Sequence, residues 1–321
     1  MNNNRIGYAC INMTLSQPPK RSGIERITTN RTARKATWDK LGTKYLGELA
    51  LQNANDLIKI LEWNEKHDIR FFRISSDIIP FADKFDLNEL PQLDAIKDAL
   101  LKAGMYARKH NHRITTHPGP FHILGSNKQR VVDDSIIGLE RHSEIFDMMG
   151  YEPSFENKIN IHIGTVSDGK DVISKRWISN YNRLSDPCKA RLVIENDDKK
   201  SMYSVLDLYE LFHTKINIPI TFDYWHHTFC TGGLSTEEAM QLAHSTWPNH
   251  IKPVVHYSES KRHESIRAGI ENAEKIREQA HADYIYNNID TFGLEVDIML
   301  EAKQKELAVL RHRQLIEENY K

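Results

Sequence analysis

The chain has 321 residues, of which 40% are hydrophobic and 27% are charged, and its formal net charge is −1. This length and composition suit one barrel-sized domain, and the lack of a long uncharged apolar run excludes a membrane-spanning protein. Because the net charge is near zero, contact with nucleic acid would have to use a local basic segment. The three cysteines have no metal-binding spacing, which indicates a reduced, cytoplasmic protein, or a nuclear one in a eukaryote.

The first predicted element is a strand at residues 5–10, and a basic segment follows at residues 17–44. Within this segment only Glu25 and Asp39 are acidic. Its cations are Lys20, Arg21, Arg26, Arg31, Arg34, Lys35, Lys40 and Lys44. If the chain folds as a barrel, this segment follows the first strand, and we expect it to form a loop over the open end that carries the active site and to contact DNA phosphates. The alternative is that the segment is a solvated loop and the start of a helix.

Short apolar runs then alternate with helix-like segments along the whole chain. The predicted strands are 5–10, 70–75, 113–117, 159–162, 192–195, 219–223, 253–256 and 297–301. The predicted helices are 44–67, 90–111, 131–149, 171–183, 201–212, one from residue 235, 259–281 and 302–321, with a long mouth loop at 224–233. This order predicts one α/β domain over residues 1–321, a (β/α)8 TIM barrel with a C-terminal helix.

Six of the predicted strands end in a side chain that can bind a metal ion. These side chains are His117, His162, Glu195, Asp223, His256 and Glu301, and His226 follows Asp223 by three residues. In a barrel they converge on the C-terminal mouth, where mixed histidine and carboxylate ligands favour Zn²⁺ or Mn²⁺. Glu195 on a central strand can bridge two ions, and ions about 3.5–4 Å apart suit phosphoryl displacement.

The residues around these strand ends resemble the UV-damage endonuclease family. The resembling blocks are 5–15, 28–32, 72–82, 116–119, 161–164, 194–198, 223–227, 255–258, 281–285 and 297–303. Each block alone is weak evidence for the resemblance. Their order and their spread over nearly the whole chain make the resemblance specific to this family. The resemblance implies a nick on the 5′ side of a UV photoproduct, and in some members of an abasic site, that leaves a 3′-hydroxyl and a 5′-phosphate.

The resemblance also implies a site with up to three metal ions, usually Mn²⁺, and damaged double-stranded DNA as the partner. The implied ligands are His117, His162, Glu195, Asp223, His226, His256, His281 and Glu301, with Asp77 where some relatives place a histidine. Of these we take Glu195, His256 and Glu301 as catalytic. The implied DNA contacts are Tyr8, Asn12, Arg31, Pro120 and Phe121.

The sequence departs from the family pattern at two places. Many relatives have Gln-Tyr or Gln-Phe after the His-Pro-Gly turn, and that pair probes the gap left by flipped-out bases; this chain has Pro120-Phe121. Some relatives carry a carbamylated lysine at the position of Val254. These departures imply a different lesion range and a third metal position that depends on His226 and His281.

Three other functions remain open from the sequence. An abasic-site endonuclease of the endonuclease IV type would have nearly the same metal site. A metal-dependent sugar isomerase or epimerase shares the barrel and the ligand types, although it needs no basic segment. A protein that binds damaged DNA without cutting it would not need so many ligands. A monomer suits a duplex that lies across the barrel mouth.

Overall fold

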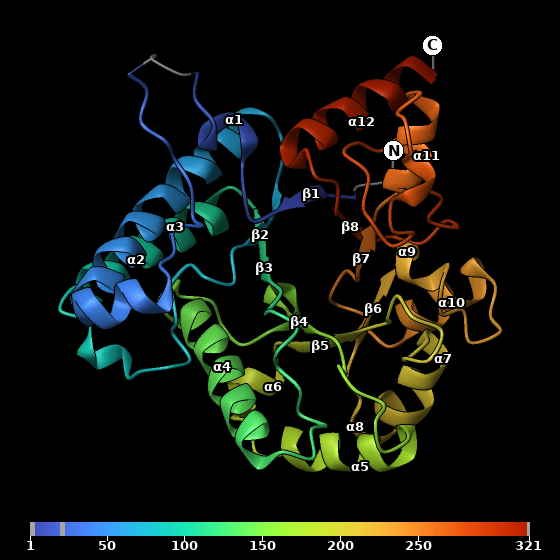
Figure 1. Cartoon of the computed structure of the whole chain (residues 1–321), viewed down its shortest axis with the longest axis horizontal. Coiled ribbons are helices and arrows are strands. Elements are labelled where there is room, and N and C mark those ends of the chain that lie inside the picture. Colours follow the sequence, from blue (N-terminus) through green and yellow to red (C-terminus); the bar gives the residue numbers. More distant parts are fainter. Residues whose placement is uncertain (1–3, 20–22, 320–321) are drawn as a thin grey trace. The chain divides into compact units, whose positions relative to one another are not determined.

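The computed structural model describes residues 4–19 and 23–319. These residues form a closed parallel barrel whose eight strands follow chain order, so the predicted (β/α)8 class is confirmed (Figure 1). The strands are β1 (Ile6–Ala9), β2 (Phe71–Ile74), β3 (Arg113–Thr116), β4 (Ile159–Ile161), β5 (Leu192–Glu195), β6 (Ile220–Asp223), β7 (Val254–Tyr257) and β8 (Asp297–Leu300). Each overlaps the strand predicted at its position.

The connections between the strands contain the helices. They are α1 (Met13–Ser16), α2 (Lys35–Lys66), α3 (Leu93–Lys109), α4 (Gln129–Met148), α5 (Lys170–Tyr181), α6 (Asp186–Lys189), α7 (Val205–Leu208), α8 (Thr214–Ile216), α9 (Tyr224–His227), α10 (Thr236–Ser245), α11 (Lys261–Arg267) and α12 (Lys305–Asn319). Four short helical turns complete the set: η1 (Leu87–Glu89), η2 (Phe155–Asn157), η3 (Tyr209–His213) and η4 (Ala273–Lys275).

Most of the strands are rich in apolar residues because their side chains are buried, although β3 (Arg113–Thr116) is largely polar. Every residue of β3, β4, β5, β6 and β8 is buried. A strand covered on both faces needs apolar residues at successive positions, not at alternate ones. Polar side chains that face the mouth therefore come from the carboxyl ends of the strands, as with Glu195 of β5, Asp223 of β6 and His256 of β7.

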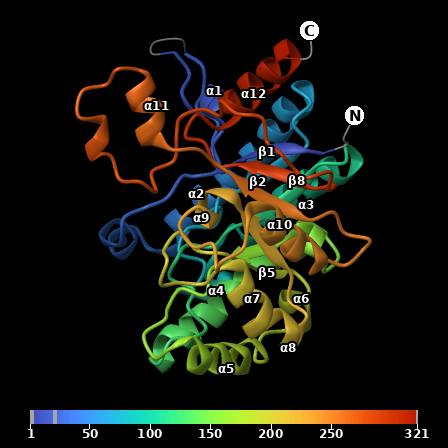
Figure 2. The same ribbon diagram turned by 90° about the vertical axis from the view of Figure 1, so that its right-hand side faces the viewer.

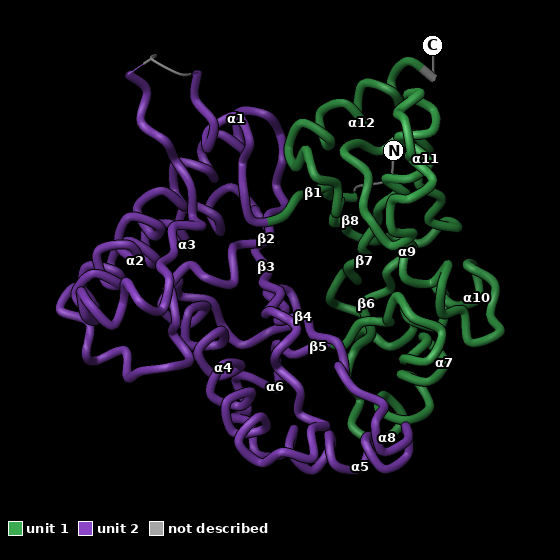
Figure 3. Tube along the Cα trace, viewed as in Figure 1, with its two compact units in different colours: residues 1–9, 194–321 green, residues 10–193 purple. Residues whose placement is uncertain are grey.

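The chain divides into two compact units (Figure 3). Unit 1 comprises Met1–Ala9 and Ile194–Lys321, and unit 2 comprises Cys10–Val193. Within unit 1, β1 pairs with β8 and α12 packs on both strands (Figure 2). Within unit 2, α2 packs along α3. The expectation that residues 1–321 form a single domain stays a prediction.

The prediction of a loop over residues 17–44 is wrong in its second half. Helix α2 begins at Lys35, and Gly42, with φ of +74°, interrupts it between two helical pieces. The side chain of Lys35 pairs with Asp39 four residues on and lies over the ring of Trp38, contacts that favour a helix there. Lys20 and Arg21 of the basic segment lie outside the described residues.

The predicted helices at 259–281 and 302–321 also differ from the structure. The segment 259–281 holds only α11 and η4, because Gly269 and Asn272 adopt left-handed backbone angles that end a helix. Helix α12 begins at Lys305 instead of residue 302. The predicted mouth loop 224–233 opens with the short helix α9. Among the described residues, no helix has the length and apolarity needed to cross a membrane.

Candidate metal centre

Unit 1 contains a buried cluster of three predicted ligands. One ligand atom from each of Glu195, Asp223 and His256 lies within 4.8 Å of the other two. Strand register produces this proximity, because Asp223 on β6 is paired with His256 on β7. Nδ1 of His256 lies 3.1 Å from Oε1 of Glu195 and 3.4 Å from Oε1 of Glu301. Two carboxylates facing one imidazole nitrogen form a donor set that suits a divalent metal ion.

Asp223 is held so that one of its carboxylate oxygens points into the cluster. Its backbone N–H donates to Oδ1 of Asn196 at 2.8 Å, and the Asn196 side chain donates back to the Asp223 carbonyl at 3.0 Å. Oδ1 of Asp223 accepts the backbone N–H of His226 at 2.8 Å. Oδ2 is buried and has no hydrogen-bond partner among the described residues. A buried carboxylate oxygen without a donor is costly unless a cation takes it.

The electrostatics of Asp223 suit a site that binds a cation. Burial, together with the carboxylates of Glu195 and Glu301, raises the pKa of Asp223 to about 7, although His226 opposes the shift. Three carboxyl groups held this close repel one another when ionised. A divalent ion removes this repulsion, so the residues present fit a metal centre.

Three predicted histidine ligands have the same hydrogen-bond arrangement. Nδ1 of His226 donates to the Asn196 carbonyl at 2.9 Å, and Nδ1 of His281 donates to the Glu301 carbonyl at 2.8 Å. In unit 2, Nδ1 of His117 donates to the Pro118 carbonyl at 3.0 Å. A carbonyl can only accept, so each neutral ring carries its lone pair on Nε2. This second contact is typical of histidines that bind metal through Nε2.

Unit 2 brings together the two histidines that follow β3 and β4. The ring centroids of His117 and His162 lie 5.5 Å apart. Behind them, Nδ1 of His142 on α4 lies 3.5 Å from Oγ1 of Thr116, the residue before His117. Burial lowers the pKa of His142 to about 3, with smaller effects from His122 and His117, so this ring stays neutral. Both strand ends therefore present a histidine as the sequence predicted.

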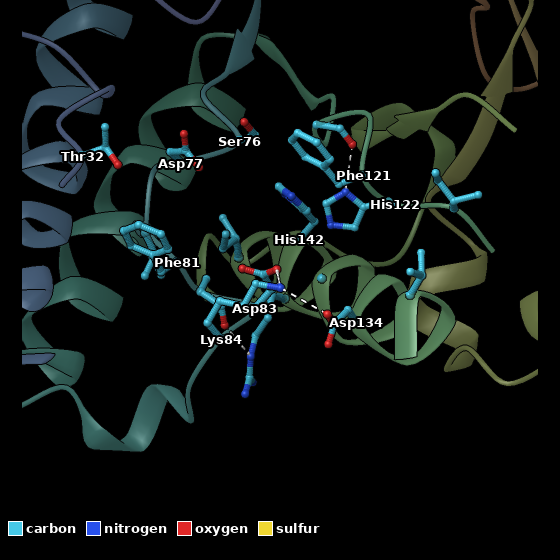
Figure 4. Close-up of a pocket in the computed structure, with 18 residues that line it drawn as sticks. Thr32, Ser76, Asp77, Phe81, Asp83, Lys84, Phe121, His122, Asp134 and His142 are labelled. Atoms are coloured by element: carbon cyan, nitrogen blue, oxygen red, sulfur yellow. Dashed lines mark hydrogen bonds and ion pairs between the residues drawn. The ribbon is translucent and has the colours of Figure 1, made fainter. Parts of the chain in front are cut away.

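Asp77, the predicted ligand that stands where some relatives have a histidine, lies apart from the clusters described above. It belongs to no cluster of three metal-type side chains among the described residues, so its ligand role stays a prediction. It lines a cavity of about 640 Å³ in unit 2 together with Asp83, His122 and His142 (Figure 4). Desolvation and the carboxylate of Asp83 raise the pKa of Asp77.

Two predicted DNA contacts are buried. Tyr8 and Asn12 have no solvent-exposed surface. Oδ1 of Asn12 accepts the backbone N–H of Leu15 at 2.9 Å, so this side chain caps α1. A direct contact between DNA and either side chain would require a change of conformation, and their DNA role stays a prediction.

Arg31 is the third predicted contact, and its guanidinium is occupied within unit 2. It forms an ion pair of 2.7 Å with Asp56 and donates to the carbonyls of Thr28 and Arg26 at 2.6 and 2.8 Å. Through these contacts Arg31 stabilises the loop that contains it. The described cations of the basic segment that are exposed to solvent are Arg26, Arg34, Lys35, Lys40 and Lys44.

Phe121 differs from these three because it is exposed. It has 82% of its surface accessible, the highest value among the exposed large hydrophobic residues of the described chain. It follows the Pro118-Gly119-Pro120 turn beyond β3 and also lines the cavity of Figure 4. An aromatic ring in water has no structural reason to remain there, so it is a candidate for stacking on a ligand.

Sequence reasoning missed two residues that organise these sites. Asn196 holds Asp223 and His226, and its only signal was its place directly after a predicted ligand at a strand end. His142 lies inside a predicted helix, where nothing in the spacing separates it from a surface residue. Asn196 contacts two predicted ligands, and His142 contacts Thr116 beside a third; only the folded chain creates these contacts.

The fold and the cluster define an α/β barrel with a candidate metal centre. The sequence profile of the family described as UV-endonuclease UvdE matches residues 4–320. The chain therefore belongs to the UV-endonuclease UvdE family, and the predicted resemblance is confirmed.

Individual proteins agree with this assignment. The UV-damage endonuclease of Schizosaccharomyces pombe is 36% identical over 313 residues, which cover 95% of this chain but only 49% of that protein. This chain thus spans about half the length of that relative. The putative UV-damage endonuclease of Acanthamoeba polyphaga mimivirus is 32% identical, over 97% of this chain and 91% of that protein. The crystal structure of SacUVDE matches with a TM-score of 0.81 and 32% identity, over 99% of both chains.

Proposed function

We propose that this protein is a DNA repair endonuclease that requires divalent metal ions. In this proposal it nicks the backbone on the 5′ side of UV photoproducts in double-stranded DNA and leaves a 3′-hydroxyl and a 5′-phosphate. The observation that carries the proposal is the buried cluster of Glu195, Asp223 and His256 in a chain of the UV-endonuclease UvdE family.

The proposed metal centre has two or three ions, with Mn²⁺ as the first candidate and Zn²⁺ as the second. Its proposed ligands are His117, His162, Glu195, Asp223, His226, His256, His281 and Glu301. Bound there, the ions supply Lewis-acid stabilisation of the charge that develops on a phosphodiester as it is hydrolysed. Val254 offers no donor atom, so His226 and His281 would hold the third position.

The chain's own residues have separate tasks in this proposal. Asn196 fixes Asp223 through two hydrogen bonds, and the Asn196 carbonyl fixes the ring of His226. Glu195, His256 and Glu301 lie at or directly after the ends of β5, β7 and β8 and form the catalytic group. Phe121 contacts the damaged strand, and the exposed cations of residues 26–44 contact DNA phosphates.

Cleavage of abasic sites alone is the second candidate function. Pro120 stands where many relatives have a glutamine, and a proline side chain has no amide group to donate or accept hydrogen bonds in the gap left by flipped bases. An abasic site has lost its base, so its recognition does not require these amide hydrogen bonds. Stacking by Phe121 would then be sufficient to recognise the lesion.

A nicking assay with Mn²⁺ on three matched duplexes tests the proposal. One duplex contains a thymine dimer, one contains an abasic site and one is undamaged. Cleavage of the dimer duplex that EDTA and Glu195→Gln both abolish supports the proposal. Cleavage of the abasic duplex alone supports the second candidate, whereas a lack of cleavage of any duplex contradicts both and makes sugars the next substrates to test.

A further inference from the structure

The turn that displays Phe121 is short and has little support of its own. It runs from His117 to Ile123, and its middle contains two prolines and Gly119. Within it, the backbone N–H of His122 points at the Gly119 carbonyl at 3.5 Å, the long end of hydrogen-bond range. A ring as exposed as Phe121 keeps a fixed direction only if a neighbouring element holds this turn.

That neighbour is helix α4, and the contact is made by His122. Nδ1 of His122 donates to the Gly119 carbonyl at 3.0 Å, so the ring closes the turn (Figure 4). The opposite edge of the ring lies against Gly138. A Cβ atom added at Gly138 would fall 2.1 Å from Nε2 of His122 and 2.7 Å from its Cδ2. The ring can occupy this position only because residue 138 has no side chain.

A glycine in the middle of a long helix is itself unfavourable, since alanine forms helix better and loses less entropy. Gly138 lies well inside α4 and its φ is not positive, so the backbone does not require glycine there. The space it leaves for His122 is the physical reason for its presence that the structure provides.

Other residues on the same face of α4 support the turn. Oγ of Ser135 accepts the backbone N–H of Ile123 at 2.8 Å and donates to the Val131 carbonyl at 2.6 Å. The ring of His142 lies edge-on to His122, with centroids 5.9 Å apart. Positions 135, 138 and 142 are spaced by three and four residues, so they share one face of the helix.

We propose that His122 and Gly138 form a seat that positions Phe121 for recognition of damaged DNA. This inference rests on the proposed function, which it deepens by naming positioning residues for lesion recognition. Among the described residues, the side chain of His122 forms no hydrogen bond with a proposed metal ligand, and Gly138 has no side chain. The seat acts through the direction and rigidity of the turn that carries Phe121.

The test is Gly138→Ala, because the added methyl group overlaps the ring of His122. We expect the ratio of affinities for a dimer duplex and an undamaged duplex to fall roughly 5- to 150-fold, as for loss of one base–aromatic stack. Hydrogen exchange in residues 117–123 should become faster, and stabilisation of the protein by Mn²⁺ should not change.

Gly104→Ala is the matched control, since it is also a helical glycine. A Cβ atom at Gly104 would fall 2.0 Å from the carbonyl oxygen of Met149, at the far end of α4 from the turn. It should lower stability but leave the affinity ratio and the exchange of residues 117–123 at the wild-type values. An equal loss of the affinity ratio in both variants would overturn the inference, because general destabilisation would then explain it.

A double-mutant cycle separates the seat from other effects of Gly138. His122→Ala removes the ring without crowding the helix and should lower the affinity ratio by itself. Gly138→Ala should then add no further loss in the His122→Ala protein. A full additional loss there, or unchanged exchange in both single variants, would refute the seat.

The exchange measurement needs no DNA. If the wild-type protein shows no preference for the dimer duplex, the proposed function fails. Faster exchange of residues 117–123 in Gly138→Ala would still establish that the seat holds the turn.

Discussion

Asp223 and His226 are joined by a hydrogen bond of 2.8 Å from the His226 backbone N–H to Oδ1 of Asp223. This bond occupies one oxygen of a fully buried carboxylate and turns the other, Oδ2, toward Glu195 and His256. The short helix α9, which begins at Tyr224, creates the geometry, because Asp223 is its N-cap. The same helix cap therefore ends a strand and orients a proposed metal ligand.

The first prediction concerns Glu195, the carboxylate nearest to His256. Glu195→Gln keeps the shape of the side chain but removes its charge, so we expect weak metal binding and nicking slower by about 100-fold or more. For the wild-type protein, Mn²⁺ at 100 times its dissociation constant should stabilise the fold by about 2.7 kcal/mol. Thermal unfolding with and without Mn²⁺ measures this effect.

The control for that prediction is Glu210→Gln, which makes the same change at an exposed position in unit 1. It should bind metal and cleave DNA like the wild-type protein. Full Mn²⁺ stabilisation of Glu195→Gln would show that Glu195 is not a ligand.

The second prediction is that metal affinity depends on pH. The pKa of Asp223 is raised to about 7 by burial and by neighbouring carboxylates, so a bound metal ion must displace its proton below that pH. Affinity should rise by up to about tenfold per pH unit between pH 5 and 7 and then level off. Isothermal titration in buffers of different ionisation enthalpy reports the released proton.

The stability of the metal-free protein should change in the opposite direction. A carboxyl group with a raised folded-state pKa contributes stability at low pH that is lost as the pH rises toward about 7. Asp223→Asn should flatten this loss. A metal-free protein that gains stability over this pH range, and loses that gain in Asp223→Asn, would contradict the assignment.

The third prediction concerns Phe121 directly. Phe121→Ala should weaken binding of a dimer duplex by about 1–3 kcal/mol, since it removes one stacking surface, while fold stability stays nearly constant. Ile137→Ala is a matched control, because Ile137 is also an exposed apolar residue and lies on α4. Equal affinities for Phe121→Ala and the wild-type protein would show that this ring does not contact the lesion.

The fourth prediction distinguishes structural cations from DNA-binding ones. Arg31→Ala should lower the free energy of unfolding by about 3 kcal/mol, because it leaves the buried carboxylate of Asp56 with Lys59 as its one remaining cationic partner among the described residues. Lys40→Ala should leave stability unchanged and reduce the slope of log affinity against log salt by about one. If Arg31→Ala instead kept its stability and lowered the salt slope, the result would indicate that Arg31 contacts DNA.

The fifth prediction concerns stability in acid. Two hydrogen bonds from Arg70, with help from His112, lower the pKa of Glu65 to about 2. The stability that this carboxylate contributes is present above its ordinary pKa near 4.5 and is lost as the pH falls toward 2. Unfolding temperature should therefore fall less steeply over this range in Glu65→Gln. Identical curves would mean that the contact adds no pH-dependent stability.

The strands and the metal-type side chains at their ends were predictable because both leave local signals. A buried parallel strand favours a run of apolar residues, and a histidine or carboxylate at the end of such a run stands out. Glu195, Asp223 and His256 could be found in this way without knowledge of any contact between them.

The roles of Asn12, Arg31 and Gly138 could not be predicted, because each depends on a partner distant in the sequence or on local backbone geometry. Asn12 caps a four-residue helix too short to show periodicity, and Arg31 pairs with Asp56 on the following helix. Gly138 looks like a weak position in a helix until His122 is placed against it. A sequence pattern indicates which residues are suited to bind DNA or metal, but it does not show which of them already have partners.

The position and chemistry of the cut test the account most directly. A duplex with one thymine dimer, labelled at the 5′ end of the damaged strand, is incubated with the Mn²⁺-loaded protein and its product is compared with synthetic markers. The account predicts one nick on the 5′ side of the dimer, a labelled fragment that DNA polymerase can extend from its 3′-hydroxyl, and no product from Glu195→Gln. A nick on the 3′ side, a fragment that cannot be extended, or equal cleavage by Glu195→Gln would contradict it.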